Sequence, residues 1–476
     1  MEVKVTAQNI PDFPRIMIAA PSSGSGKTTI TCALLELLKE KGRKTVSFKC
    51  GPDFIDPMFH KQVLGVPSAN LDSFFCDEGK LREIFLENSE GKTAVIEGVM
   101  GLFDGLGGKS LKASSYDIAQ ITNTPILLVV DAGGMSRSVL PLIKGFLDYD
   151  KKNSPSRECL IKGVFLNKVS EGQAKLLKSL IEEELGIKVA GYFSKKSQNV
   201  WKSRHLGLLL PSEIENLREQ IADSAKELEK SLDFSLLEAI MNNKEEGSGE
   251  SPKERPFPKR NFLASDFQFS VCIAVARDEA FCFYYEENLR LLEKLGARLV
   301  YFSPLHDKAL PESVQGILIG GGYPELYAKE LENNKSMKES IRSAVENGAS
   351  LMAECGGFMY LQEKLIKDDE VFEMCGVLKG ECRYTGKLVR FGYAEFTPLA
   401  SESLGSFFPD GFSIRGHEFH YFDSTNNGSS FHAQKPISKK SWDCMIFTPK
   451  MLAGFPHLYY ESAPEIVSWF VNSCRK

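Results

Sequence analysis

The chain has 476 residues, of which 42% are hydrophobic and 25% charged, and its formal net charge is −5. This length predicts two or three domains, and the composition is that of a globular protein. The small negative charge provides no basic field for nucleic acid, so we expect no nucleic-acid partner. The sequence has no membrane-length apolar stretch and no signal-peptide layout, so we expect no membrane association and a cytoplasmic location. The eleven cysteines include no C-x-x-C pair, so neither a zinc ribbon nor a disulfide framework is indicated.

The first motif in chain order is APSSGSGKTT, which follows an apolar run at 16–20 and precedes a stretch with helical periodicity. A strand, a glycine-rich turn, Lys-Thr and a helix form the layout of a phosphate-binding loop. Pro21 replaces the first glycine of the strict pattern, which marks a subfamily. Lys27 is expected to reach the β- and γ-phosphates, and the Thr28 hydroxyl to hold Mg²⁺. The motif predicts binding of ATP or GTP by Ser23, Gly24, Ser25, Gly26, Lys27, Thr28 and Thr29.

Polar residues follow the next apolar runs, which we predict as strands at 45–49, 93–97, 126–131 and 161–166 of a parallel sheet covered on both faces. Ligands bind at the carboxyl ends of such strands. Lys49 is therefore a candidate for neutralising phosphate charge. Asp53 and Asp56 are expected close to the phosphates, with Asp53 a candidate Mg²⁺ ligand and Asp56 a candidate substrate-binding residue. A plain Gly-Pro-Asp turn with solvated aspartates is the alternative.

Three more residues end predicted strands of this half. Glu97 is our preferred second metal carboxylate, and Asp131 is the competing one. Asn167 lies at a position from which several nucleotide-binding folds read the purine base, although a simple turn explains the same spacing.

The segment 242–260 is rich in charge, Gly, Ser and Pro, which is typical of a linker. We therefore divide the chain into a first domain at 1–240, a linker at 241–266 and a second domain at 267–476. Strand and helix alternate again after the linker, with strands at 271–276, 298–302, 316–319 and 350–353 and helices at 285–295 and 337–347, which predicts a second doubly wound domain. Beyond about residue 375 the pattern favours antiparallel strands.

Cys355, in the string ECGGF, lies at a predicted strand-to-helix junction. Such a turn projects the thiol outward next to a helix N-terminus, which suits a nucleophile. His457 and His417 are both candidate bases, and the sequence does not choose between them. The string RGHEFHYF places its histidines three residues apart among strand-like neighbours, which excludes an H-E-x-x-H zinc site. We expect a substrate-contacting loop there, with Arg415, His417 and His420 as candidate substrate-binding residues.

Together these strings resemble the cobyrinate a,c-diamide synthase family. The strings that carry the resemblance include FKCGPDFIDPMFH, IEGVMGLFDG, GGGYPELYA, ECGGFMYL and RGHEFHYF, and they span nearly the whole chain outside the linker. The resemblance implies an α/β fold: a P-loop domain like dethiobiotin synthetase, with a parallel sheet, followed by a flavodoxin-like class I glutamine amidotransferase domain.

The resemblance also implies site residues. Cys355 would attack glutamine and His457 would activate it, with an oxyanion hole formed by the backbone at Gly321, Gly322 and Gly356. Class I amidotransferases usually carry an acid two residues after this histidine, where this chain has Tyr459, so the group that orients His457 is left open. Lys49, Asp53 and Glu97 become the expected phosphate and Mg²⁺ residues.

The implied reaction is the ATP-dependent amidation of the a and c acetates of cobyrinate through acyl phosphates, with ammonia from glutamine. The expected cofactor is Mg²⁺, with ATP as co-substrate. The expected partners are the small-molecule substrates ATP, glutamine and cobyrinate or a related tetrapyrrole. A homodimer is a further possibility that the resemblance leaves open. Alternative readings are the amidation of Ni-sirohydrochlorin, cobyric acid synthesis, and a partitioning-type P-loop ATPase switch. The string GPDFIDPMFH argues against cobyric acid synthesis. The switch lacks its extra early lysine here and leaves Cys355 unexplained.

Overall fold

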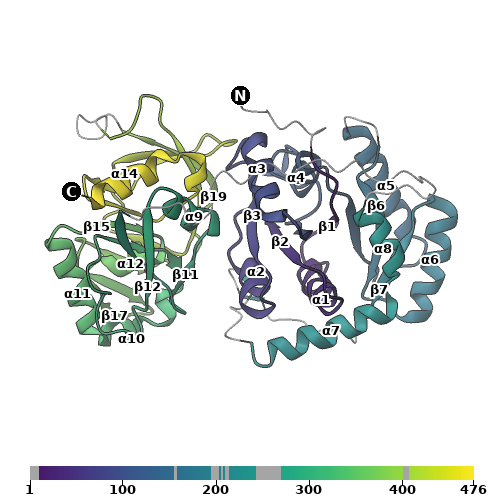
Figure 1. Cartoon of the computed structure of the whole chain (residues 1–476), viewed down its shortest axis with the longest axis horizontal. Coiled ribbons are helices and arrows are strands. Elements are labelled where there is room, and N and C mark those ends of the chain that lie inside the picture. The colour runs from purple at the N-terminus through teal and green to yellow at the C-terminus, as the bar shows by residue number, and fades with distance from the viewer. Residues whose placement is uncertain are drawn as a thin grey trace. The chain divides into compact units, whose positions relative to one another are not determined.

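The computed structural model describes residues 10–154, 158–194, 203–204, 207–208, 214–242, 270–399 and 407–475. The chain divides into two compact units, residues 1–260 and 261–476 (Figure 1). Nearly all of the predicted linker at 241–266 lies outside the described residues. Among the described helices, none combines the length and the apolar composition needed to cross a membrane.

The first unit is built on a seven-stranded sheet of order β3-β2-β4-β1-β5-β6-β7 with every pair parallel. Side chains of these strands are buried almost throughout, as expected for a sheet covered on both faces. The five strands predicted in this half are confirmed to within one residue. The strands are β1 (Arg15–Ala19), β2 (Thr45–Cys50), β3 (Ser68–Leu71), β4 (Thr93–Glu97), β5 (Ile126–Asp131), β6 (Ile161–Asn167) and β7 (Val189–Phe193).

Helices connect these strands, and polar N-caps start several of them. The side chains of Asp77, Ser114 and Ser170 each accept a hydrogen bond from a backbone N–H of the first helical turn. A two-stranded ribbon of β8 (Ser203–Arg204) and β9 (Gly207–Leu208) completes the described elements of this unit. The α-helices are α1 (Lys27–Glu40), α2 (Ile55–Met58), α3 (Glu78–Ser89), α4 (Ser115–Thr122), α5 (Val139–Asn153), α6 (Glu171–Leu185), α7 (Leu217–Ser231) and α8 (Phe234–Met241).

The second unit contains a six-stranded sheet of order β12-β10-β13-β15-β25-β24, parallel except for the edge strand β24. The predicted strands and helices of this half are confirmed, with ends that differ by one or two residues. Its strands are β10 (Val271–Ala276), β12 (Ala297–Phe302), β13 (Gly316–Ile319), β15 (Ser350–Glu354), β24 (Ile446–Thr448) and β25 (Met451–Gly454), and the helices of this unit are α9 (Glu286–Lys294), α10 (Ala328–Asn333), α11 (Lys335–Glu346), α12 (Gly356–Leu361) and α14 (Glu465–Cys474).

Smaller sheets of mainly antiparallel strands complete this unit. Most of their strands lie beyond residue 375, where antiparallel strands were predicted, and four of them lie before it. Their orders are β23-β22-β19-β20-β26, β17-β16-β18-β21 and β11-β14. The strands are β11 (Phe281–Phe283), β14 (Gly321–Gly322), β16 (Lys364–Lys367), β17 (Glu370–Glu373), β18 (Glu381–Tyr384), β19 (Arg390–Pro398), β20 (Ile414–His420), β21 (Phe422–Ser424), β22 (Phe431–Gln434), β23 (Ser441–Cys444) and β26 (His457–Leu458).

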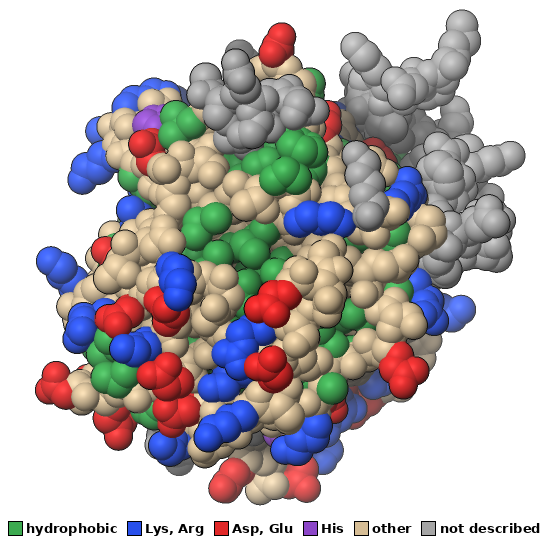
Figure 2. Space-filling view, turned by 90° about the vertical axis from the view of Figure 1, so that its left-hand side faces the viewer, with side chains coloured by type: hydrophobic (Ala, Val, Ile, Leu, Met, Phe, Trp, Pro, Cys, Tyr) green, Lys and Arg blue, Asp and Glu red, His purple; other side chains and the backbone are tan. Residues whose placement is uncertain are grey.

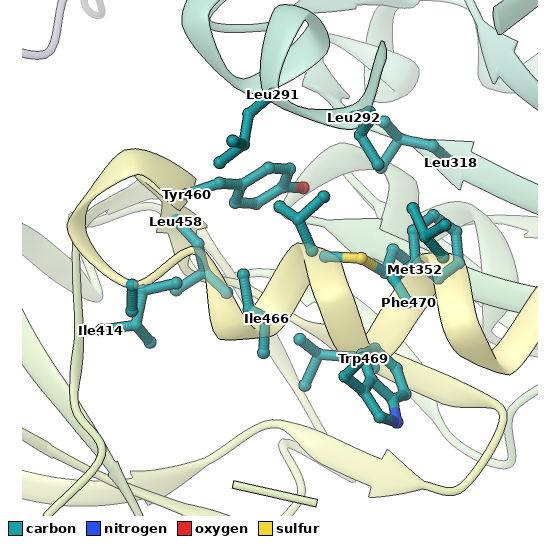
Figure 3. Close-up of a cluster of buried hydrophobic side chains, with 14 of the residues drawn as sticks. Leu291, Leu292, Leu318, Met352, Ile414, Leu458, Tyr460, Ile466, Trp469 and Phe470 are labelled. Atoms are coloured by element: carbon teal, nitrogen blue, oxygen red, sulfur yellow. The ribbon is translucent and has the colours of Figure 1, made fainter. Parts of the chain in front are cut away.

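One core of the second unit joins α14 and α9 to the sheets. Figure 3 shows Ile466, Trp469 and Phe470 of α14 with Leu291 of α9 and Tyr460 in this cluster. On the molecular face seen in Figure 2, basic and acidic side chains are interspersed, which agrees with a small net charge.

We expect Phe470→Ala to lower the free energy of unfolding of the second unit by about 3–5 kcal/mol, because its ring is fully buried and its removal leaves a cavity. Urea denaturation followed by fluorescence measures the loss. Phe391→Ala is the matched control, because that ring is 60% exposed, and we expect a change within about 0.5 kcal/mol. Equal losses in the two variants would contradict the assignment of this core.

Candidate active sites

The phosphate-binding loop of the first unit joins β1 to α1. Gly24 and Gly26 adopt φ values of 76° and 93°, a backbone conformation that glycine takes without strain. The Lys27 ammonium folds back over the loop and donates hydrogen bonds to the carbonyl oxygens of Ser22 (3.1 Å) and Met100 (2.6 Å). Burial, with a smaller effect of the Lys49 charge, lowers the pKa of Lys27 to about 8. This arrangement holds a cation at the mouth of the loop, where phosphates would replace the two carbonyls as its partners.

A buried cluster of charged residues lies beside the loop, at the carboxyl ends of β2 and β4. The Thr28 hydroxyl donates to Glu97 Oε1 at 2.6 Å, and Lys49 Nζ lies 2.8 Å from the same oxygen. Lys49 also contacts the carboxylate of Asp56. The structure therefore brings together four residues that the sequence placed near the phosphates.

The charges in this cluster depend on one another. Burial is the largest influence on the pKa of Lys49 and acts to lower it, but the Asp56 and Glu97 carboxylates outweigh burial and raise the pKa well above its usual value. Burial likewise acts to raise the pKa of Glu97, but Lys49 and His60 outweigh it and lower that pKa. Glu97 is thus held as a carboxylate although its side chain is fully buried.

The residues predicted to bind Mg²⁺ fit the ion in part. Thr28 and Glu97 offer a hydroxyl and a carboxylate within hydrogen-bonding distance of each other, and Mg²⁺ is usually bound by one or two such groups together with substrate phosphates. Asp53 instead accepts hydrogen bonds from the backbone N–H groups of Ile55 and Asp56 through Oδ1, as a turn residue does. Within the described residues, no cluster of three or more His, Cys, Asp or Glu could hold a metal without other ligands.

Asn167 and Asp131 end β6 and β5 on the other side of the loop. The Asn167 amide donates to the carbonyl oxygen of Ser25 at 2.7 Å, so it braces the phosphate-binding loop. Asp131 forms an ion pair with Lys168 at 2.5 Å, and that lysine also donates to the carbonyl oxygen of Gly24. The hydroxyl of Thr28 hydrogen-bonds to Glu97, which supports the preference for Glu97 over Asp131.

His60 belongs to this cluster, and sequence reasoning did not single it out. Its ring is fully buried in the π-helical turn at Phe59–Val63, and Nε2 lies 3.3 Å from Glu97 Oε2. His60 is the last residue of the string GPDFIDPMFH, but no spacing rule in the sequence connects it to Glu97.

In the second unit, Cys355 lies between β15 and α12. Its φ and ψ are 46° and −104°, a conformation that L-residues rarely adopt and that is found at nucleophile turns. Burial, followed by the charges of Glu325 and Glu418, raises the pKa of the thiol well above its usual value, whereas a hydrogen bond from the Gly356 N–H lowers it. The resting group is therefore a neutral thiol that needs a base.

His457 lies on β26, and its position relative to the Cys355 turn is set by glycines. A Cβ atom added at Gly321 would lie 2.3 Å from Cε1 of His457, and one added at Gly356 would lie 3.2 Å from the backbone nitrogen of Gly322. Gly321 therefore lies against the imidazole, and Gly356, the residue after Cys355, lies against the backbone of Gly322. This close approach fits the predicted oxyanion hole, which needs backbone N–H groups next to the nucleophile.

The loop conformation predicted at Arg415–His420 is wrong, because these residues form strand β20, paired antiparallel with β19. Their contact with substrate stays a prediction. Ile414, Gly416, Glu418 and His420 are buried on one face of the strand, and His417 is buried on the other. His420 contacts Glu418 and the carbonyl oxygen of Phe422, and the exposed fractions of His417 and His420 are only 7% and 4%. His417 stacks on His457, with ring centroids 4.9 Å apart.

Burial lowers the pKa of His417 to about 3, so the folded state keeps its imidazole neutral while the unfolded chain binds a proton below about pH 6.5. The stability that results is complete above pH 6.5 and is lost as the pH falls toward 3, by about 1.4 kcal/mol per pH unit. We expect His417→Gln to reduce the slope of unfolding free energy against pH between 6 and 4.5 by that amount, as measured by urea denaturation.

The control for this slope is Phe391→Ala, because that side chain is exposed and carries no titratable group. A His417→Gln protein with the slope of the parent would show that His417 is protonated in the folded state.

Comparisons with known proteins cover both units. The family model of the CobQ/CobB/MinD/ParA nucleotide binding domain matches residues 16–209, and that of the CobB/CobQ-like glutamine amidotransferase domain matches residues 272–463. The chain is 40% identical to the cobyrinate a,c-diamide synthase of Caldanaerobacter subterraneus subsp. tengcongensis, over 96% of this chain and 98% of that protein. It is 38% identical to the same enzyme of Listeria innocua over 95% and 98% of the two chains, and 36% identical to that of Priestia megaterium over 97% of each.

Proposed function

Because the chain belongs to the cobyrinate a,c-diamide synthase family, we propose that it amidates the a and c acetate carboxylates of cobyrinate, using ATP and the ammonia released from glutamine. The observation that carries the proposal is the presence in one chain of two different sites. One is a phosphate-binding loop with a Lys-carboxylate cluster, and the other combines a strained cysteine with a histidine whose ring lies against Gly321.

In the second unit, the Cys355 thiol gives its proton to His457 and the sulfur attacks the side-chain amide carbon of glutamine. The resulting oxyanion accepts hydrogen bonds from the backbone near Gly322 and Gly356. His457 returns the proton to the leaving nitrogen, the C–N bond breaks, and ammonia leaves. Water then hydrolyses the thioester to glutamate and restores the thiol.

In the first unit, a carboxylate oxygen of the tetrapyrrole attacks the γ-phosphorus of ATP, and ADP leaves. The product is an acyl phosphate, a better electrophile than a carboxylate. Ammonia attacks its carbonyl carbon, and phosphate leaves as the amide forms. Lys27 and Lys49 would offset the repulsion between the triphosphate and a polycarboxylate substrate. Asn167 would serve this step by bracing the loop, with base recognition as its further expected role.

Mg²⁺ bound with ATP would neutralise part of the phosphate charge. Thr28 and Glu97 are the residues that would hold it, with Asp53 as a further candidate through water. Asp56, Arg415, His417 and His420 remain our candidates for positioning substrates.

Ni-sirohydrochlorin is the second candidate substrate, because enzymes with the same architecture amidate it. The test is mass spectrometry of the products after incubation of the purified protein with ATP, Mg²⁺ and glutamine, with each tetrapyrrole offered separately. We expect a diamide from cobyrinic acid. A diamide from the nickel compound alone would move the chain to the other substrate, and ATP hydrolysis with no amide from either compound would overturn the proposal.

A further inference from the structure

The histidine of a cysteine–histidine pair works best when a third group fixes its ring. In this chain the position two residues beyond His457, where an acid is usual, is held by Tyr459, whose ring packs edge-on against Tyr285 with centroids 5.2 Å apart. A different group of the second unit would therefore have to orient His457.

Glu354 is the carboxyl group that the fold brings to this imidazole. Its Oε2 lies 4.0 Å from Nδ1 of His457, and the two side chains are 10% and 3% exposed. The sequence separates the two residues by about a hundred positions. They meet because Glu354 pairs with Gly454 in the parallel register of β15 and β25, and His457 follows only three residues later.

The position of Glu354 is itself fixed from behind. Its Oε1 accepts a hydrogen bond of 2.8 Å from the hydroxyl of Tyr460, and a backbone N–H of Leu458 also donates to it. The ring of Tyr460 is buried in the core shown in Figure 3, near Leu291 and Leu458. A carboxyl group held by a core tyrosine and a strand N–H has little freedom to turn away from the imidazole.

Resting on the proposed roles of Cys355 and His457, we propose that Glu354 is the positioning residue of the glutaminase site: its carboxyl group faces Nδ1 and thereby leaves Nε2 for the thiol proton. The thiol and its positioning acid are then neighbours in the chain. The positive φ at Cys355 points their two side chains in different directions. The group that stabilises the imidazolium comes from the strand before the nucleophile and not from the residue two positions after the histidine.

The electrostatic surroundings agree with this arrangement. Burial, despite the hydrogen bonds from Tyr460 and Leu458, raises the pKa of Glu354 to about 8, and burial together with His417 and His420 lowers the pKa of His457. In the resting site both groups are therefore close to neutral. When the imidazole takes the thiol proton at Nε2, the Glu354 carboxyl oxygen that faces Nδ1 stabilises the positive charge, and no proton leaves Glu354.

The test is Glu354→Gln, which keeps the size of the side chain and an oxygen for the Tyr460 hydroxyl. We expect kcat for glutamine hydrolysis to fall on the order of 10²-fold with KM for glutamine nearly unchanged, because the substitution acts on the base and not on substrate binding. Labelling of Cys355 by a glutamine-analogue diazoketone, followed by mass spectrometry, should slow to a similar extent. Amidation with added ammonium chloride should stay within about twofold of the parent, since it bypasses this site.

Two further variants test whether Glu354, and not the residue two positions after His457, positions the imidazole. Tyr459→Phe removes the only polar atom at the position where an acid is usual, and we expect it to leave kcat nearly unchanged. Tyr460→Phe leaves Glu354 in place without its hydroxyl donor and should lower kcat by about tenfold. If Glu354→Gln does not fold, the Tyr460→Phe result decides in its place.

A kcat within threefold of the parent for Glu354→Gln, or a large loss in Tyr459→Phe, would overturn the inference. The proposed function is tested separately by His457→Ala. If that variant keeps glutamine-dependent activity, the role of His457 is wrong. If it is inactive while Glu354→Gln is fully active, only the role of Glu354 is wrong.

Discussion

Cys355→Ala is expected to abolish glutamine-dependent amidation, with a loss of at least about 10³-fold, while ammonia-dependent amidation continues. The substitution removes the only sulfur at the strained turn between β15 and α12 and leaves the fold of the first unit untouched. The measurement compares amide formation from cobyrinic acid with glutamine and with ammonium chloride as the nitrogen source, at saturating ATP.

Comparing the two nitrogen sources distinguishes an unfolded variant from one that lacks only the nucleophile. A variant that merely unfolds loses both activities, whereas a variant that lacks only the nucleophile loses one. Cys272→Ser is the matched control, because Cys272 is buried in the same sheet on β10, where it pairs with Arg298 of β12. An active Cys355→Ala protein, or an equally inactive Cys272→Ser protein, would contradict the assignment.

The parts that could be predicted from the sequence are those in which neighbouring residues act together. The phosphate-binding loop and the Cys355 turn are each a strand, a glycine-rich turn and a helix, so a short string contains all of their geometry. Most strands of the two parallel sheets were found for a similar reason, because a strand buried on both faces is a continuous apolar run. The short strands β3 and β7 were missed, since SANL alternates polar and apolar residues over only four positions and VAGYF contains a glycine.

The residues that sequence reasoning missed are those whose partners lie far away in the chain. His60 meets Glu97 through the packing of a π-helical turn, and Glu354 meets His457 through the register of β15 and β25. No spacing rule predicts either contact. The segment at 415–420 was predicted as a loop because most of its residues are polar. It is a buried strand because it pairs with β19 and β26, which lie elsewhere in the sequence.

The two sites of the chain have opposite electrostatic environments: one contains charged groups, and the other keeps its reactive groups neutral. The nucleotide site concentrates ionisable groups: Lys49 contacts both Asp56 and Glu97, and all three side chains are almost fully buried. The glutaminase site keeps a thiol and two stacked imidazoles neutral by burial. A neutral pair suits attack on an uncharged amide, whereas the charged cluster suits a triphosphate and a carboxylate substrate.

Lys27→Ala is expected to reduce amidation on the order of 10³-fold with either nitrogen source, because both routes need the acyl phosphate. Lys27 is the loop cation, and its carbonyl partners at Ser22 and Met100 are groups that it would exchange for phosphate oxygens. Binding of a fluorescent ATP analogue should weaken as well, whereas labelling of Cys355 by the glutamine analogue should proceed, since that reaction takes place within the second unit.

The matched control is Lys41→Ala, at the C-cap of the same helix, where the lysine makes an exposed ion pair with Glu229 that contributes little to stability. We expect it to behave as the parent in every assay. Ammonium chloride is expected to rescue Cys355→Ala but not Lys27→Ala. This difference is expected if glutamine supplies ammonia at one site and the carboxylate is activated at the other. Rescue of Lys27→Ala by ammonium chloride would contradict activation of the carboxylate at the phosphate-binding loop.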